Sequence, residues 1–290
     1  MNQTIQKSWA FLRLILRAMV IGFIILAIGI VPWSALASAN LKFASSVPWA
    51  AAVMIAYLFL LLMYLRGKCW PKSTSDVRRR YLRANIIRGR LLVWSGISGG
   101  FLACGLMTIT AVGWMLVPTH SSRLAEFSLL STYSPWMAVP LLMMGAAVAG
   151  VVEESAFRGY MQVPIEEKYG SIPAIGIVAI VFSIIHFPGI IALPVFLVGA
   201  LGWGFLAYLS GSIMPGIVFH TLVNGIVWLW AFLNLETFQE LLASSVLEEG
   251  MYPAFLVAAV LAIIFVLGTL LAFFKLAQIR REKSYRTQEA

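Results

Sequence analysis

Residues 136–158 read WMAVPLLMMGAAVAGVVEESAFR, an apolar run that ends in two glutamates and an arginine. A helix of about 20 apolar residues crosses the hydrocarbon core of a bilayer, so this run predicts a membrane span. Charged side chains within a span cost on the order of several kcal/mol each, and membrane proteins keep them mainly where function needs them. Glu153, Glu154 and Arg158 are therefore the first candidate functional residues.

The composition of the whole chain indicates a helical membrane protein. Hydrophobic residues make up 61% and charged residues 11% of the 290 positions, whereas soluble domains have roughly 45–50% and 25%. We expect an all-α fold, a polytopic bundle of about eight transmembrane helices that forms a single membrane domain over residues 1–290. Cys69 and Cys104 suggest neither a disulfide framework nor a metal cluster.

Eight apolar runs give the expected order of the spans. They cover about residues 18–39, 47–65, 91–117, 136–168, 172–187, 190–209, 215–233 and 253–276. The first run follows a basic segment and lacks a small-residue cleavage site, so we expect it to remain as a span. A short interfacial helix is expected within 118–135, a helix break at Pro188-Gly189, and an acidic loop at 234–251.

The basic residues predict how the bundle sits in its membrane. With the N-terminus in the cytoplasm, 19 Lys and Arg fall on the cytoplasmic side, and only Lys42 and Arg123 fall outside. This asymmetry follows the positive-inside rule and places both termini in the cytoplasm. The compact chain, without eukaryotic sorting signals, suggests a multi-pass protein of a bacterial inner membrane.

The net charge of +9 does not indicate a nucleic-acid partner, because the membrane topology explains where the basic residues lie. The longest polar stretch, 66–90, carries nine basic residues against one acid. We expect this loop to contact anionic lipid headgroups on the cytoplasmic side.

Two further polar pairs lie within apolar runs. Phe182 precedes His186 by four residues, and His220 precedes Asn224 by four. Residues four apart share one face of a helix, so each pair presents its groups together. By the same spacing Glu154 pairs with Arg158, and Glu153, about 100° away around the helix, is left for another partner.

The turn between the fourth and fifth spans predicts which of these groups meet. Glu153 and His186 are equally distant in sequence from the junction of Tyr169 and Gly170. Gly170 suits a helix C-cap and Pro173 the first turn of the next helix. If the fourth span continues through Pro164 to about residue 168, both groups lie roughly 25 Å from the tip. The site is then sunk below the cytosolic surface and open to it.

Such groups favour hydrolysis of an amide. A glutamate beside a histidine can hold and deprotonate a water molecule, so Glu153 and His186 are the expected catalytic pair. His220 and Asn224 then supply donors for the developing oxyanion. Ser155 and Ser183 have the surroundings of packing residues.

Zinc is the alternative way to hold the water. Glu153, His186 and His220 form a feasible ligand set. Histidines that bind metal usually have a second hydrogen-bond partner, and the candidates near in sequence are Ser183, Thr221 and Asn224. Because these are few, we expect that no cofactor is required.

In this order on successive apolar helices, Glu-Glu-x-x-x-Arg, Phe-x-x-x-His and His-x-x-x-Asn resemble the CPBP family. This family, also called Abi, comprises CaaX-prenyl proteases and bacteriocin-processing or immunity proteins, and the resemblance covers about residues 136–233. It implies an eight-helix intramembrane protease fold. It also implies that Glu153 and His186 activate water, that His220 and Asn224 stabilise the oxyanion, and that Glu154, Arg158 and Phe182 support them.

The expected function is that of an intramembrane endopeptidase whose substrate is a peptide or a membrane protein. A prenylated CaaX protein is the substrate that the eukaryotic branch of the family suggests. The alternative is a non-proteolytic membrane scaffold or bacteriocin-immunity-type protein that binds a partner through the same cavity. A transporter is disfavoured because no internal repeat is evident.

Overall fold

The structure is a computed structural model that describes residues 3–43, 46–116, 122–186, 193–243 and 245–288. Within these ranges every regular element is a helix, which confirms the predicted all-α polytopic bundle. Among the described residues, six helical stretches are long and apolar enough to cross a membrane, and two of the expected eight spans are shorter apolar helices. The six are α1 (Gln3–Phe43), α4 (Arg90–Leu116), α6 (Pro135–Glu153) with its continuation to Tyr169, α9 (Leu193–Ser210), α10 (Met214–Leu233) and α13 (Pro253–Gln288); the shorter two are α2 (Trp49–Leu65) and α8 (Ser171–Ile185).

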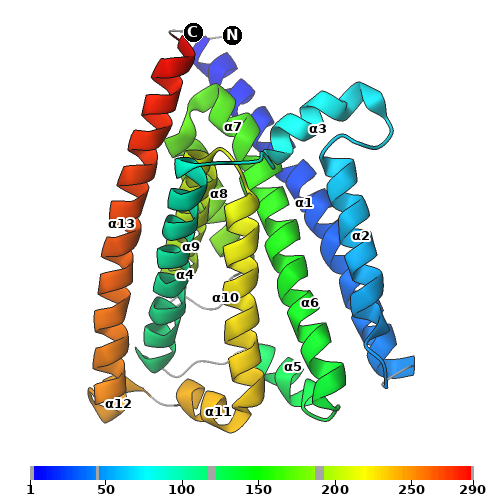
Figure 1. Ribbon diagram of the computed structural model, residues 1–290, viewed down its shortest axis with the longest axis vertical. Coiled ribbons are helices and arrows are strands. Elements are labelled where there is room, and N and C mark those ends of the chain that lie inside the picture. Colours follow the sequence, from blue (N-terminus) through cyan, green and yellow to red (C-terminus); the bar gives the residue numbers. More distant parts are fainter. Residues whose placement is uncertain (1–2, 44–45, 117–121, 187–192, 244, 289–290) are drawn as a thin grey trace.

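The connecting segments lie at two ends of the bundle (Figure 1). Both termini, α3 (Ser75–Leu82) and α7 (Gln162–Tyr169) lie at one end. At the other end lie α5 (Ser122–Leu130), α11 (Leu235–Ala243) and α12 (Val246–Glu249). The segments that the charge count assigns to one side of the membrane therefore share one end of the molecule.

Two segments expected as loops are folded. The acidic stretch 234–251 forms α11 and α12, because Phe238 and Leu242, four residues apart, are both buried beneath the bundle. The basic stretch contains a 3₁₀ turn (Lys72–Thr74) and α3. There the buried Arg78 guanidinium donates hydrogen bonds of 2.7–2.8 Å to three backbone carbonyls of the preceding chain. The predicted α5 is present, whereas the break at Pro188-Gly189 lies outside the described residues.

The helix that carries the two glutamates changes its form at the site. It begins as α6, continues as a π-helix, η2 (Glu154–Met161), and returns to α-geometry as α7. The expected continuation past Pro164 to the Gly170 cap is therefore confirmed. Pro164 has no N–H to donate to the carbonyl four residues earlier, and the π segment ends at Met161, three residues before it. Such segments often occur at functional sites.

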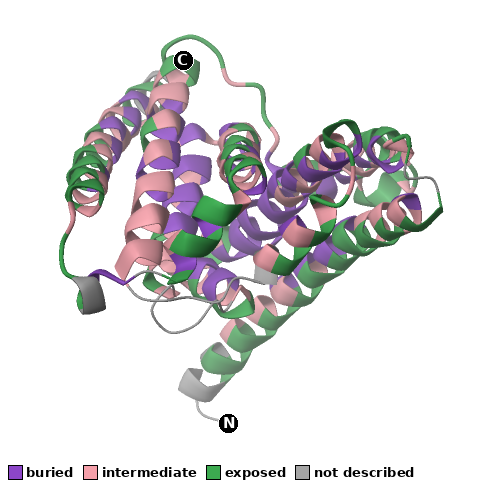
Figure 2. Ribbon diagram, turned by 90° about the horizontal axis from the view of Figure 1, so that it is seen from below, coloured by how far each residue is buried: buried purple, intermediate pink, exposed green. Residues whose placement is uncertain are grey.

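Buried residues lie toward the middle of the bundle and exposed ones on its outer faces (Figure 2). Small residues let the central helices approach closely, as is common in membrane bundles. Gly150 of α6 lies against Thr221 of α10, and Gly216 of α10 lies against Glu154. On the other side, Gly22 of α1 lies against Met161. These contacts bring α10 and α1 against the segment that carries the glutamates.

Candidate active site

The two adjacent carboxylates have different partners. Oε1 of Glu154 lies 3.2 Å from Nη1 of Arg158 and 3.0 Å from Nδ1 of His220. Oε2 of Glu153 lies 3.6 Å from Nε2 of His186 and 3.8 Å from Nε2 of His220. The structure thus contains the predicted Glu154–Arg158 pair and brings Glu153 to His186, the contact expected from their equal distance to the Gly170 turn.

His186 caps the C-terminus of α8, and its orientation is set by its own helix. Nδ1 lies 2.8 Å from the carbonyl oxygen of Phe182, which can only accept, so Nδ1 carries the hydrogen. In the neutral ring, Nε2 then carries a lone pair that faces Glu153. The ring is stacked on Phe182, with centroids 4.1 Å apart.

His220 lies between the two glutamates. Its Nδ1 donates to the carboxylate of Glu154, so Nε2 of the neutral ring is again a lone pair that faces Glu153. Three acceptors, two imidazole nitrogens and one carboxylate oxygen, therefore meet around one point. They need a shared donor, and a water molecule or an additional proton meets that need.

Arg158 is the cation of the buried cluster, with none of its surface exposed. Nη1 is at ion-pair distance from Glu154 without hydrogen-bond alignment, and Nη2 donates to the carbonyl of Ala200 over 3.3 Å. The guanidinium also lies over the Phe182 ring, 4.7 Å from its centroid. Arg158 thereby connects η2 to α8 and α9.

The charges of this cluster do not balance when both histidines are neutral. Glu153 and Glu154 carry two negative charges against the single positive charge of Arg158, and all three residues are buried. An uncompensated buried charge is costly. A group of opposite charge, or one that shares a proton with Glu153, would reduce this imbalance.

Asn224 lies one turn beyond His220 on α10 and is half-buried. Among the described residues its side-chain amide has no hydrogen-bond partner. Its role as a donor to the oxyanion stays a prediction.

Two of the nearby candidates for second partners of the histidines, Ser183 and Thr221, make other contacts. Ser183 donates to the carbonyl of Ala179 in its own helix, and Thr221 packs against Gly150. The partners observed are the Phe182 carbonyl for His186 and the Glu154 carboxylate for His220. The latter joins two separate helices, and no spacing within one helix reveals it.

Zinc was the alternative expected from the sequence. The described residues contain no group of three or more His, Cys, Asp or Glu side chains arranged to hold a metal ion. Nε2 of His186 and Nε2 of His220 both lie near Oε2 of Glu153, so these residues stay the candidate ligands and the metal-free reaction stays a prediction.

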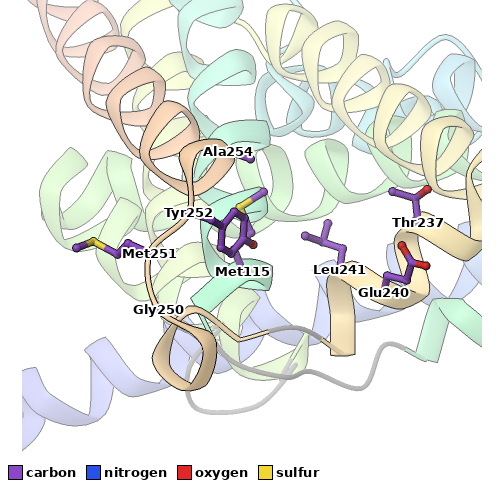
Figure 3. Close-up of a pocket in the computed structure, with 8 residues that line it drawn as sticks. All are labelled: Met115, Thr237, Glu240, Leu241, Gly250, Met251, Tyr252 and Ala254. Atoms are coloured by element: carbon purple, nitrogen blue, oxygen red, sulfur yellow. The ribbon is translucent and has the colours of Figure 1, made fainter.

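An open surface pocket of about 500 Å³ lies at the end of the bundle formed by α11 and the start of α13 (Figure 3). None of the site residues lines it. The lining residues are Met115, Thr237, Glu240, Leu241, Gly250, Met251, Tyr252 and Ala254. This pocket is therefore separate from Glu153 and Glu154 of the candidate active site.

The long apolar helices indicate an integral membrane protein, as the sequence predicted. The model of the family "Type II CAAX prenyl endopeptidase Rce1-like" matches residues 135–226. This segment runs from the start of α6 into α10 and contains all three motifs. Residues 135–226 are thus similar to this family of prenyl endopeptidases, in the region where the sequence motifs resembled the CPBP family. Neither a curated protein nor a solved structure matches the chain.

Proposed function

We propose that this protein is an intramembrane endopeptidase that hydrolyses a peptide bond with a water molecule held by Glu153 and His186. The observation that carries the proposal is the convergence of Oε2 of Glu153 with Nε2 of both histidines at 3.6 and 3.8 Å. The reaction takes place in a membrane cavity open to the cytosol, on the side of α7.

The reaction begins with the removal of a proton from water. Glu153 accepts this proton, and the hydroxide attacks the carbonyl carbon of the substrate. The Asn224 amide donates to the oxyanion that develops, and the proposed role of His220 is to donate to it as well, from Nε2, once that atom has taken up a proton. Glu153 then passes its proton to the amide nitrogen, and the C–N bond breaks to give an acid and an amine.

The remaining residues hold this arrangement. Glu154 accepts from Nδ1 of His220 and so selects the ring orientation in which Nε2 faces the reacting atoms. Arg158 balances the charge of Glu154. Phe182 supplies the carbonyl and the ring that orient His186.

Purified protein and two substrates test the proposal, a farnesylated CaaX reporter peptide and the same peptide without its lipid. We expect Glu153→Gln and His186→Ala to lower turnover about 100- to 10,000-fold, the usual cost of losing a general base. Glu167→Gln is the matched control, because Glu167 is 42% exposed and pairs with Arg80 at the surface. A Glu153→Gln protein that retains more than about a tenth of wild-type turnover contradicts the role of Glu153.

The rival function, a scaffold or immunity-type protein, uses the same cavity only to bind a partner. A cellular assay separates the two functions. If a strain that carries Glu153→Gln keeps the wild-type phenotype while a deletion loses it, the protein acts by binding. Loss of the phenotype in both strains supports proteolysis.

The membrane partner we propose is anionic lipid at the basic stretch 66–90, on the cytoplasmic face of a bacterial inner membrane. Lys68 and Lys72 are exposed and flank Trp70, which is 83% exposed. A tryptophan between lysines is typical of a membrane interface, where the ring lies at headgroup level. We expect Lys68→Gln/Lys72→Gln to reduce phosphatidylglycerol retained on purification, measured by mass spectrometry, with phosphatidylcholine retention as the control. Equal retention of phosphatidylglycerol would contradict this partner.

A further inference from the structure

Helix α9 contributes no residue to the three motifs, yet it contacts both histidines of the site. The ring of Phe196 stacks against His186 with centroids 5.6 Å apart and planes 25° apart. The indole of Trp203 stacks against His220 at 5.8 Å, with the planes only 9° apart. The two aromatic residues are seven positions apart and therefore lie on one face of α9.

The same face of α9 is hydrogen-bonded to the glutamate-bearing helix. The carbonyl of Ala200, between the two aromatic residues, accepts from Arg158 over 3.3 Å. One turn further, the carbonyl of Gly204 accepts from Gln162 over 3.2 Å. The aromatic face is thus held in register with η2 by two side chains that are fully buried.

Glycines on α9 hold the helix close to its other neighbours. A Cβ atom at Gly202 would lie 2.5 Å from Leu102 of α4, and one at Gly204 would lie 2.9 Å from Ile175 of α8. Real Cβ atoms do not approach so closely, so α9 has no room to shift toward either helix. The aromatic face that α9 presents to the histidines therefore belongs to a helix packed closely between α4 and α8.

Each imidazole needs two constraints before Nε2 has a defined position. The hydrogen bond at Nδ1 restrains the position of that atom. It leaves the tilt of the ring plane less well defined, because the χ2 torsion of histidine is broad. Stacking on an aromatic ring restricts the plane. His186 lies between Phe182 and Phe196, each 25° from its plane, and His220 lies against Trp203.

We propose that Phe196 and Trp203 are positioning residues, which hold the planes of the two imidazoles so that both Nε2 atoms face Glu153. This inference rests on the proposed peptidase function and adds α9 as a further element of the site. Neither aromatic residue touches the reacting atoms.

The first test compares variants at two aromatic positions of α9. Phe205 is the matched control, because it contacts Phe273 of α13 and no histidine. We expect Trp203→Leu to lower kcat about tenfold with KM within twofold of wild type, since small displacements of reacting groups are costly. Trp203→Phe restores most of kcat because it keeps an aromatic face. Phe205→Leu stays near wild type.

A second readout does not depend on turnover. Diethyl pyrocarbonate modifies accessible imidazole nitrogens, and peptide mass spectrometry reports each histidine separately. His220 exposes only 9% of its side chain, so it reacts slowly in the wild type. We expect Trp203→Leu to speed its modification several-fold and Phe205→Leu to leave it unchanged. Phe196→Leu, at a half-buried position, gives the corresponding test for His186 if Trp203→Leu does not fold.

The outcomes separate the two proposals. Unchanged modification of the histidines, a Trp203→Leu loss confined to KM, or a Trp203→Phe protein as slow as Trp203→Leu would overturn the positioning role. If the wild type cleaves neither peptide but modification still responds to Trp203→Leu, the peptidase proposal fails while the positioning of the rings stands.

Discussion

Nδ1 of His220 lies 3.0 Å from Oε1 of Glu154, and this contact joins α10 to η2 in the buried centre of the bundle. The same carboxylate oxygen is also at ion-pair distance from Arg158. The other oxygen, Oε2, has no partner among the described residues and lies against Gly216. Glu154 is therefore held between a cation, an imidazole and the backbone of α10, with no free space on that side.

Gly216→Ala tests this packing. A Cβ atom at position 216 would lie 2.6 Å from Oε2 of Glu154, too close without movement of the carboxylate. We expect the substitution to displace Glu154 from His220 and to lower peptidase turnover at least tenfold, about the cost of a misplaced group. Gly176→Ala in α8 is the control, because nothing lies within 4 Å of the added atom. Equal turnover in the two alanine variants would contradict this account of Glu154.

We expect Arg158→Ala to lower the stability of the folded protein. The substitution leaves the fully buried Glu154 with an uncompensated charge and removes the donor to Ala200. Breaking a buried pair costs about 3–5 kcal/mol. Thermal unfolding in detergent measures the effect, with Arg79→Ala as the control, since the Arg79 side chain is 72% exposed. A melting temperature equal to that of the control would refute the role of Arg158 as a structural counter-ion.

Arg83 links the basic stretch to the site helix and should contribute to stability in the same way. Its guanidinium binds both oxygens of Glu166 at 2.9 Å and donates to the carbonyl of Arg158 over 3.2 Å. Its backbone is left-handed, with φ of 51°. Arg83→Gly keeps this conformation accessible, so its loss of stability isolates the side chain. We expect a clear decrease in melting temperature for Arg83→Gly and almost none for the exposed Arg88→Gly; similar decreases would argue against the side-chain contacts.

Single cysteines test the orientation in the membrane. In a background without Cys69 and Cys104, Lys168→Cys at the tip of α7 is expected to react with an impermeant maleimide only from the cytoplasmic side. Met251→Cys, at the opposite end and 73% exposed, is expected to react only from outside. Reversal of the two patterns would overturn the orientation and the cytosolic opening of the site together.

Elemental analysis of active protein tests the metal-free mechanism. We expect wild-type protein to cleave the reporter without a stoichiometric metal and to remain active after treatment with a chelator. About one zinc per chain, lost with activity on chelation and restored on addition, would make Glu153, His186 and His220 the ligands. Glu154 accepts a hydrogen bond from His220, and metal-bound histidines usually have such a second partner. The experiment can therefore contradict the metal-free mechanism.

The sequence alone determined the class of the protein and the contacts made within single helices. The apolar runs predicted the membrane bundle, and the four-residue spacing predicted that Glu154 pairs with Arg158 and that Phe182 and His186 share a face. The equal distances to Gly170 also predicted that Glu153 meets His186, because two consecutive antiparallel helices with one short turn have a defined register.

Only the tertiary structure decided which faces of the other helices meet. The bond between His220 and Glu154 and the stacking of Trp203 on His220 join helices far apart in the sequence. Soluble helices reveal their inward face by an apolar stripe, but α9 is apolar almost all round, and α10 is apolar apart from His220, Thr221 and Asn224. In lipid, rotation about the helix axis is set instead by small residues such as Gly150, Gly202 and Gly216 that allow close packing, and their neighbours are known only once the helices are assembled.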